Sequence, residues 1–243
     1  MIRHRSLTAF ALALLTSSLI ASVASAQDAT DIVRRTDALM APQSFEARMT
    51  MDVDRDDGTH RTYELTLHRR DDNSLVLFLA PDIEKGRKML RRGDDIWMSL
   101  PNVKRPVRVS ARQSLMGGDF NNADVLRLSL VKDYTAHLDK LEGSTAVITL
   151  NARDRGVTYA RVVARIDVAT GIPVRYDYFT ESGKYVKTLE FSALKVMSDG
   201  DSRPATWNMT NLVTHRKSVM RVVDMDRNKS LPDADYTLGR FSR

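Results

Sequence analysis

The sequence contains no cysteine, and beyond its first residues it has no long apolar run. Without cysteine the chain forms no disulfide bond, offers no thiolate nucleophile and is not expected to carry a lipidated cysteine anchor. No later stretch reaches the roughly 18 apolar residues of a transmembrane helix, so nothing after the N-terminus is predicted to span a membrane. A Pro/Ser-rich linker is also missing, which predicts one domain over residues 27–243.

The common catalytic and metal-binding motifs are missing as well. There is no G-x-S-x-G or H-E-x-x-H sequence, and the histidines after residue 26 are dispersed, at His60, His68, His137 and His215. Three aspartates alternate between Asp52 and Asp56 as in a calcium loop. However, Asp57 and Tyr63 replace the glycine and the bidentate glutamate that such a loop requires. We therefore predict no enzyme, no metal and no cofactor, with a lipid hydrolase of unfamiliar design as the weakest alternative.

The first 26 residues have the pattern of a secretory signal peptide. Arg3 and Arg5 give a basic start, residues 7–23 are mainly apolar, and Ala24 to Ala26 form a small-x-small cleavage pattern. Hydroxyl side chains dilute the apolar stretch, which favours a cleaved signal over a membrane anchor. We expect the mature protein to be exported to the periplasm. Removal of the signal takes away two arginines and no acid, which lowers the formal net charge from +6 to +4.

A basic cluster lies between Lys85 and Arg112, where nine Lys or Arg residues face two Asp residues, a local balance of +7. The rest of the mature chain is therefore slightly acidic. The residues proposed for headgroup or partner contact are Arg87, Lys88, Arg91, Arg92, Lys104, Arg105 and Arg108. A solvated strand edge, protected from aggregation by charge, explains the cluster equally well. Nucleic acid is not expected, because the protein is exported and the nearby aromatic, Trp97, lies in an apolar strand.

Hydrophobic periodicity predicts a mainly β protein. A short amphipathic helix is expected over residues 28–40, and from Phe45 to Val53 apolar and polar residues alternate. Similar segments follow, giving roughly ten or eleven strands in an antiparallel meander. Ser74 to Ala80 is apolar on both faces, so both faces must be covered. A second helix, capped by Asn121, is predicted to pack on the sheet and supply part of that cover.

The segment from Pro81 to Asp124 resembles the outer-membrane lipoprotein-sorting protein family, the periplasmic carriers with a LolA-like fold. The matching residues are Pro81, the Gly-x-x-Met-Leu of Gly86 to Leu90, the run from Asp95 to Pro101, Arg105, Arg108, the run from Ser114 to Phe120, and Asp124. The resemblance implies an open antiparallel half-barrel whose apolar concave face lies under helices and receives acyl chains. It also implies transfer of an acylated lipid or lipoprotein from an inner-membrane transporter complex, with transient membrane contact.

Apolar residues on the strand faces and under the helical cover are predicted to contact the acyl chains. They are Leu77, Leu79, Met89, Ile96, Trp97, Met98, Met116 and Phe120. The leading hypothesis is a periplasmic carrier that moves an acylated molecule from the inner towards the outer membrane. The alternative is a non-carrier accessory or regulatory subunit of an envelope lipid transporter, which uses the same sheet as a docking surface.

Overall fold

The computed structural model describes residues 29–55, 57–100, 105–127, 129–229 and 231–241. The predicted signal peptide and Lys104 lie outside this range. The predicted N-terminal helix is confirmed over residues 29–40, where Ile32, Val33 and Thr36 are buried. In the described ranges, no helix has both the length and the apolar character needed to cross a membrane.

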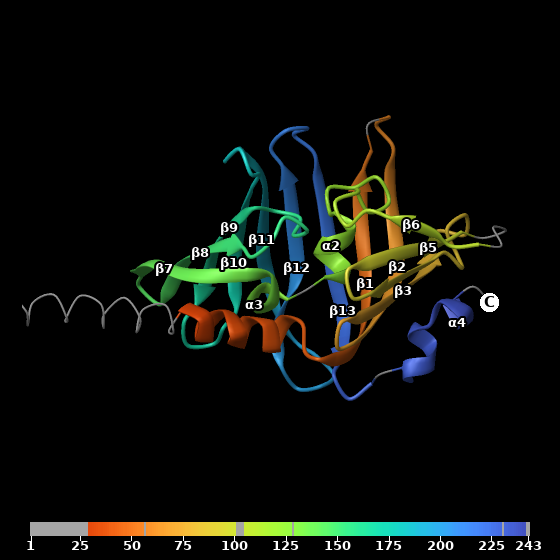
Figure 1. The fold of residues 1–243 in the computed structure, drawn as a ribbon, viewed down its shortest axis with the longest axis horizontal. Coiled ribbons are helices and arrows are strands. Elements are labelled where there is room, and N and C mark those ends of the chain that lie inside the picture. Colours follow the sequence, from red (N-terminus) through yellow and green to blue (C-terminus); the bar gives the residue numbers. More distant parts are fainter. Residues whose placement is uncertain (1–28, 56, 101–104, 128, 230, 242–243) are drawn as a thin grey trace, which may run out of the picture.

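Within the described residues the strands form one antiparallel sheet of thirteen members (Figure 1). This confirms the predicted open antiparallel sheet, although with more strands than the ten or eleven expected. Along the chain the strands are β1 (Ser44–Asp54), β2 (His60–Arg70), β3 (Asn73–Ala80), β4 (Lys88–Arg92), β5 (Asp95–Ser99), β6 (Val107–Val109), β7 (Tyr134–Glu142), β8 (Thr145–Ala152), β9 (Arg161–Asp167), β10 (Pro173–Phe179), β11 (Tyr185–Val196), β12 (Ser202–Asn211) and β13 (Lys217–Asp226).

The strands that hydrophobic periodicity did not predict are short or highly charged. β4 carries three cations in five residues, and β6 has only three residues. β7 forms one edge of the sheet, and most of its side chains are exposed or half-buried. Edge strands commonly carry charged side chains, which discourage pairing with a second chain. Such a strand lacks a regular alternation of apolar and polar residues, so hydrophobic periodicity does not detect it.

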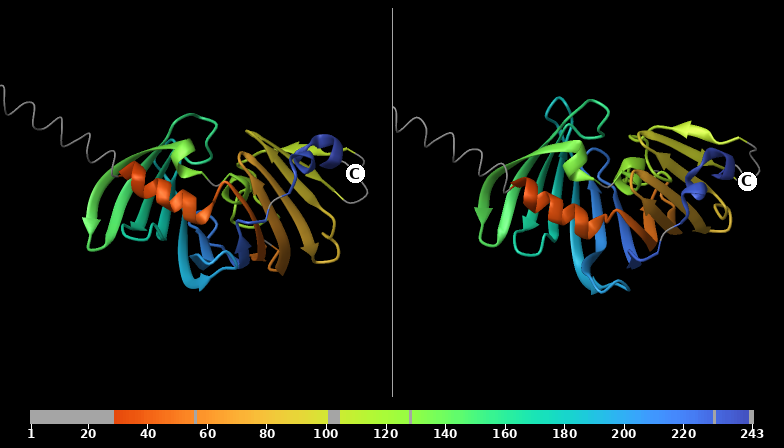
Figure 2. Two further views of the ribbon diagram at one scale, coloured as in Figure 1. Left: turned by 90° about the horizontal axis from the view of Figure 1, so that it is seen from below. Right: turned by 60° about the horizontal axis from the view of Figure 1, so that its bottom comes forward.

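The order of the strands explains why the concave face is covered. The sheet runs β6-β5-β4-β3-β2-β1-β13-β12-β11-β10-β9-β8-β7, so β6 and β7, consecutive along the chain, lie at opposite edges. The connection over residues 110–133 must therefore cross the whole sheet. This crossover contains α2 (Asn122–Leu126) and α3 (Leu130–Asp133). The N-terminal helix lies across the same open side of the curved sheet (Figure 2).

Two apolar clusters lie on opposite faces of the sheet. The larger one fills the concave face, where inward residues such as Val76, Met89 and Met209 pack against the crossover and the N-terminal helix. The smaller one contains Leu75, Leu90, Tyr236 and Phe241, with Leu77 and Trp97 packed against it. It lies beneath η1 (Asp233–Tyr236) and α4 (Leu238–Phe241). The predicted two-sided cover of β3 is confirmed, and the C-terminal segment is its outer part.

Candidate ligand-binding cavity

A cavity of about 100 Å³ lies on the concave face, beneath the N-terminal helix and the end of the crossover. Most of its wall is apolar or aromatic. The lining includes Met40, Ala123, Leu130, Tyr134, Val157, Tyr159, Val162, Tyr176, Tyr178, Leu189, Phe191 and Trp207. A neighbouring void of about 20 Å³ shares Met40 and Trp207 with it and continues towards Phe45 and Met225. The concave face therefore holds a row of voids rather than a completely filled interior.

Aromatic rings from three adjacent strands, together with Tyr159 from the loop before β9, form the far wall of this cavity. Tyr176 and Phe191 meet edge to face at 4.9 Å between ring centroids, and Phe191 meets Trp207 at 5.9 Å. Tyr159 and Tyr178 pack at 4.3 Å. Burial raises the pKa of Tyr176, Tyr178 and Tyr159 well above the usual range. Contacts of this kind hold the rings in fixed positions, which gives the cavity a rigid apolar wall.

The N-terminal helix is fastened to the crossover through Asp37. Its carboxylate accepts hydrogen bonds from the backbone N–H groups of Leu130 (3.0 Å) and Val131 (2.9 Å), and from the Ser129 hydroxyl (3.1 Å). These are free donors at the start of α3, so Asp37 caps a helix that belongs to another part of the chain. Burial raises the pKa of Asp37, while these hydrogen bonds oppose the shift.

A buried arginine also holds the C-terminal end of the same helix, close to Asp37. Arg203 donates from Nε to the backbone oxygen of Leu39 (2.6 Å). Its two terminal nitrogens contact both carboxylate oxygens of Asp199, at 2.6 and 2.8 Å. Near the middle of the helix, Thr36 donates to the oxygen of Gly171 (2.9 Å). A Cβ atom at Gly171 would lie 3.1 Å from that of Arg35, so glycine permits this close approach.

The centre of the crossover is fixed to the sheet by a buried polar network around Asp119. The Asp119 carboxylate accepts hydrogen bonds from Ser218 of β13 (2.9 Å) and Asn211 of β12 (3.2 Å). Lys187 of β11 donates to the Asp119 backbone oxygen (2.6 Å). Burial lowers the pKa of Lys187. Three neighbouring strands thus hold one residue of the crossover, and the pairing satisfies groups whose burial would otherwise be costly.

The predicted N-cap at Asn121 is confirmed. α2 begins directly after it, and the Asn121 backbone N–H donates to the Asp124 carboxylate (2.7 Å). The side chain of Asn121 has a different use, because it accepts from Lys187 (2.9 Å) and donates to the Tyr159 hydroxyl (3.2 Å). Tyr159 also donates to Asp124 (3.1 Å). Burial raises the pKa of Asp124.

The residues predicted to contact acyl chains divide between the two faces of the sheet. Met89, Ile96 and Phe120 are buried in the concave cluster, with Met98 and Met116 half-buried against it. Alternation along β3 and β5 places Leu77 and Trp97 on the opposite face, under the C-terminal segment. Leu79 is 46% exposed. None of these eight residues lines the 100 Å³ cavity. Their contact with a ligand stays a prediction.

The predicted basic cluster is also divided. Arg91 is buried and donates to the backbone oxygen of Leu126 (3.3 Å), while Arg87 pairs with Glu84 (2.6 Å). Lys88 lies over the ring of Phe241, and Arg108 pairs with Asp95. Arg92 and Arg105 are exposed. Much of the local charge therefore serves the packing of the two covers, and a headgroup role for these side chains remains a prediction.

Sequence reasoning missed the aromatic wall. The rings of Tyr176, Tyr178, Phe191 and Trp207 come from three strands and meet only through strand pairing. The stretch that forms β10 carries three aromatic residues, but none of them was predicted to line a ligand site. Aromatic residues on successive strands of a predicted concave face would have been a better indicator of the cavity.

An open antiparallel sheet with an apolar, helix-covered concave face defines the LolA-like fold. A LolA superfamily protein from Nitrosomonas europaea is similar, with a TM-score of 0.78 and 28% identity over 86% of this chain and 97% of that one. A putative outer membrane lipoprotein-sorting protein domain from Vibrio parahaemolyticus has a TM-score of 0.77 and 22% identity, over 90% of this chain and all of that one. The resemblance predicted from the sequence is confirmed.

A third structure with the same fold is a DUF1329 family protein from Desulfovibrio piger. Its TM-score is 0.76 at 22% identity, over 88% of this chain and 97% of that one. A family model described as "uncharacterized protein" matches residues 70–243, and the chain belongs to that family. No curated protein matches the sequence.

Proposed function

We propose that the protein is a periplasmic carrier that binds the acyl chain of a lipid or lipoprotein on its concave face. The observation that carries this proposal is the apolar cavity beneath the N-terminal helix, with its aromatic wall. The LolA-like fold and the predicted signal peptide support it. Transfer from an inner-membrane complex towards the outer membrane is the matching direction of transport.

The size of the cavity indicates what binding requires. Ligand pockets commonly measure about 300–1,000 Å³, whereas this cavity measures about 100 Å³. As it stands it accommodates only a few methylene groups, so a complete chain enters only if a covering element moves. Burial of a chain of about fifteen methylenes contributes on the order of 10 kcal/mol before these costs.

A cavity-filling substitution tests the proposal. Val162 lines the cavity from β9, so Val162→Phe places a ring in the void that the ligand needs. Val174→Phe is the matched control, because Val174 is 45% exposed and does not line the cavity. We expect Val162→Phe to lower the affinity for a fluorescent fatty acid by at least about tenfold, and the control to leave it unchanged. Circular dichroism should show that both variants fold.

Native lipid analysis provides a second, independent measurement. Protein purified from the periplasm should carry an acylated molecule detectable by mass spectrometry, and its chain should begin at residue 27. Ligand-free protein that also fails to bind the fluorescent fatty acid would overturn the carrier proposal. If such protein instead co-purified with a transporter, the accessory-subunit alternative would gain support.

A further inference from the structure

A second hollow lies next to the apolar cavity, at the loop between β8 and β9. This groove measures about 620 Å³, and three arginines line it, Arg112, Arg153 and Arg155. Asp154 and Glu181 line it too, so the charged residues sum to one net positive charge. The groove and the apolar cavity share two lining residues, Val157 and Thr158. An apolar site and an arginine-rich site are therefore direct neighbours.

The arginine groove is a fixed part of the fold. Arg112, at the start of the crossover, donates from Nη2 to the backbone oxygens of Arg155 (2.6 Å) and Val157 (3.1 Å). The backbone N–H of Arg153 donates to the oxygen of Asp133 (2.9 Å), and the Asp154 carboxylate accepts from the N–H of Gly156 (2.7 Å). The loop that carries two arginines is thus fastened to the crossover at two places, at Arg112 before α2 and at Asp133, the last residue of α3.

Two of the three guanidinium groups are available to a ligand. Arg153 and Arg155 are exposed, and across the described part of the chain neither guanidinium has a hydrogen-bond or ion-pair partner. This contrasts with Arg87, Arg108 and Arg127, each of which is paired with a carboxylate. Guanidinium groups bind phosphate and carboxylate oxygens through two parallel hydrogen bonds, so free arginines in a groove favour an anionic group.

An unsatisfied hydroxyl lies at the junction of the two hollows. The Oγ1 atom of Thr158 is buried and has no hydrogen-bond partner. A buried hydroxyl without a partner is costly, and nearly all such groups in folded proteins are satisfied. Thr158 lines both the apolar cavity and the groove, so an oxygen of a ligand that spans the two would lie within its reach.

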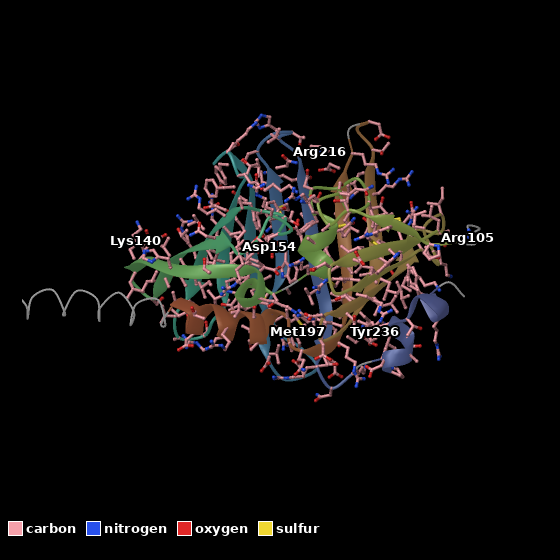
Figure 3. The ribbon with its side chains drawn as sticks, in the orientation of Figure 1. Arg105, Lys140, Asp154, Met197, Arg216 and Tyr236 are labelled. Carbon is pink, nitrogen blue, oxygen red and sulfur yellow. The ribbon has the colours of Figure 1, made fainter. Side chains whose placement is uncertain are left out.

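We propose that the arginine groove binds the anionic headgroup of the amphiphile whose acyl chain occupies the cavity. Phosphate and carboxylate share the chemistry that Arg153 and Arg155 recognise, while Thr158 binds an oxygen near the junction of head and chain. This inference rests on the proposed function and names its ligand class. The groove shares Arg112 with the basic cluster, but none of the seven residues predicted for headgroup or partner contact lines it. Figure 3 labels Asp154 near the middle of the molecule and Arg105 at its far edge.

The test uses three probes with one acyl chain length, each below its critical micelle concentration. They are a lysophosphatidylglycerol, a fatty acid and an uncharged monoacylglycerol. The variant is Arg153→Gln with Arg155→Gln, and the matched control is Arg92→Gln with Arg105→Gln, which removes two exposed arginines of the predicted cluster. Binding to the mature protein is measured by titration calorimetry at low and high salt.

We expect the groove variant to lose about tenfold in affinity for an anionic probe and less than twofold for the monoacylglycerol. The loss should shrink at high salt, because screening weakens exposed charge pairs. A loss for lysophosphatidylglycerol alone identifies a phosphate headgroup, and a loss for the fatty acid as well identifies a shared anion site. The control variant should bind all three probes as the wild type does.

Each other outcome overturns the inference in a distinguishable way. An equal loss for all three probes would mean that the arginines only support the loop. A loss confined to the control variant would return the headgroup to the predicted basic cluster. Unchanged anion binding by the groove variant, with tight monoacylglycerol binding, would refute the groove and leave the carrier proposal standing. Failure of the wild type to bind any probe would refute both.

Discussion

At Gly118 the crossover lies close against the sheet, and a single methyl group tests that close approach. A Cβ atom at this residue would lie 2.9 Å from Cγ2 of Val53 and 3.1 Å from Oγ of Ser218. Both neighbours are fully buried and belong to β1 and β13, so neither has free space into which to move. Gly118→Ala therefore forces the loop away from the strands and loosens the adjacent bonds of Asp119.

The expected magnitude follows from the cost of overpacking a filled interior. An extra methyl group in such a site destabilises by about 1–3 kcal/mol. For a domain of this size each 1 kcal/mol shifts the melting temperature by about 2–4 °C, so Gly118→Ala should melt about 2–12 °C below the wild type. Thermal denaturation followed by circular dichroism measures the shift, and urea titration converts it to a free energy of unfolding.

Two other glycines serve as controls, because they distinguish the effect of the steric contact from the effect of backbone conformation. Gly117 has φ +80° and Gly239 has an ordinary backbone, and an added Cβ atom at either meets nothing within 4 Å. Gly117→Ala should cost about 1 kcal/mol through backbone strain alone, and Gly239→Ala should be neutral or slightly stabilising. The double variant Gly118→Ala with Val53→Ala should lose less stability than the sum of the two single variants, because Val53→Ala removes the closest clash. Gly118→Ala melting like Gly239→Ala would refute the close contact.

Three further substitutions test the two covers of the sheet. Asp37→Ala should lower the free energy of unfolding by about 1 kcal/mol in urea titration, because it removes the cap of α3; no change would mean that the helix is not docked there. Burial lowers the pKa of His68, against the opposing charges of Glu46 and Asp235. The stability contributed by its neutral form is therefore complete above about pH 6.5 and lost as the pH falls, and His68→Gln should flatten stability between about pH 7 and 5. Phe241→Ala should cost about 3 kcal/mol and speed proteolysis of the C-terminal segment, and unchanged proteolysis would contradict its role as the outer cover.

Local features of the sequence were sufficient to predict much of the fold. The alternation in β1, the two-sided apolar run of β3 and the cap at Asn121 each depend on residues close together in the chain. Each pattern reflects the local backbone geometry and the side of the element that must be buried. It can therefore be recognised without knowing which segment packs against that side. The need for an outer cover of β3 was predicted, but not the segment that forms it, because Tyr236 and Phe241 come from the far end of the chain.

The candidate site was harder to predict, because residues that are neighbours along a strand do not lie on the same face of the sheet. Residues 87–92 read as one basic patch, yet β4 is pleated, so its successive side chains point to opposite faces of the sheet. Arg91 is consequently buried towards α2 while Lys88 lies on the outer side against Phe241. Conversely, Arg112 and Arg155 are 43 positions apart and meet because the crossover must pass the β8–β9 loop.

The proposed carrier requires one cover of the concave face to move, and the polar contacts of the two covers differ. The crossover is joined to the sheet at both of its ends, and its centre is fixed by the buried contacts of Asp119 with three strands. Releasing it would break these contacts and leave Lys187 and Ser218, which are buried on the sheet, without Asp119 as a partner, a costly state. The N-terminal helix is held by the hydrogen bonds of Asp37, Thr36 and Leu39, and when it leaves, Arg203 retains its bidentate pair with Asp199. Because the cavity lies directly beneath this helix, displacement of the helix in the proposed carrier would enlarge the space for a ligand, while the anchored crossover and its arginine groove would stay in place.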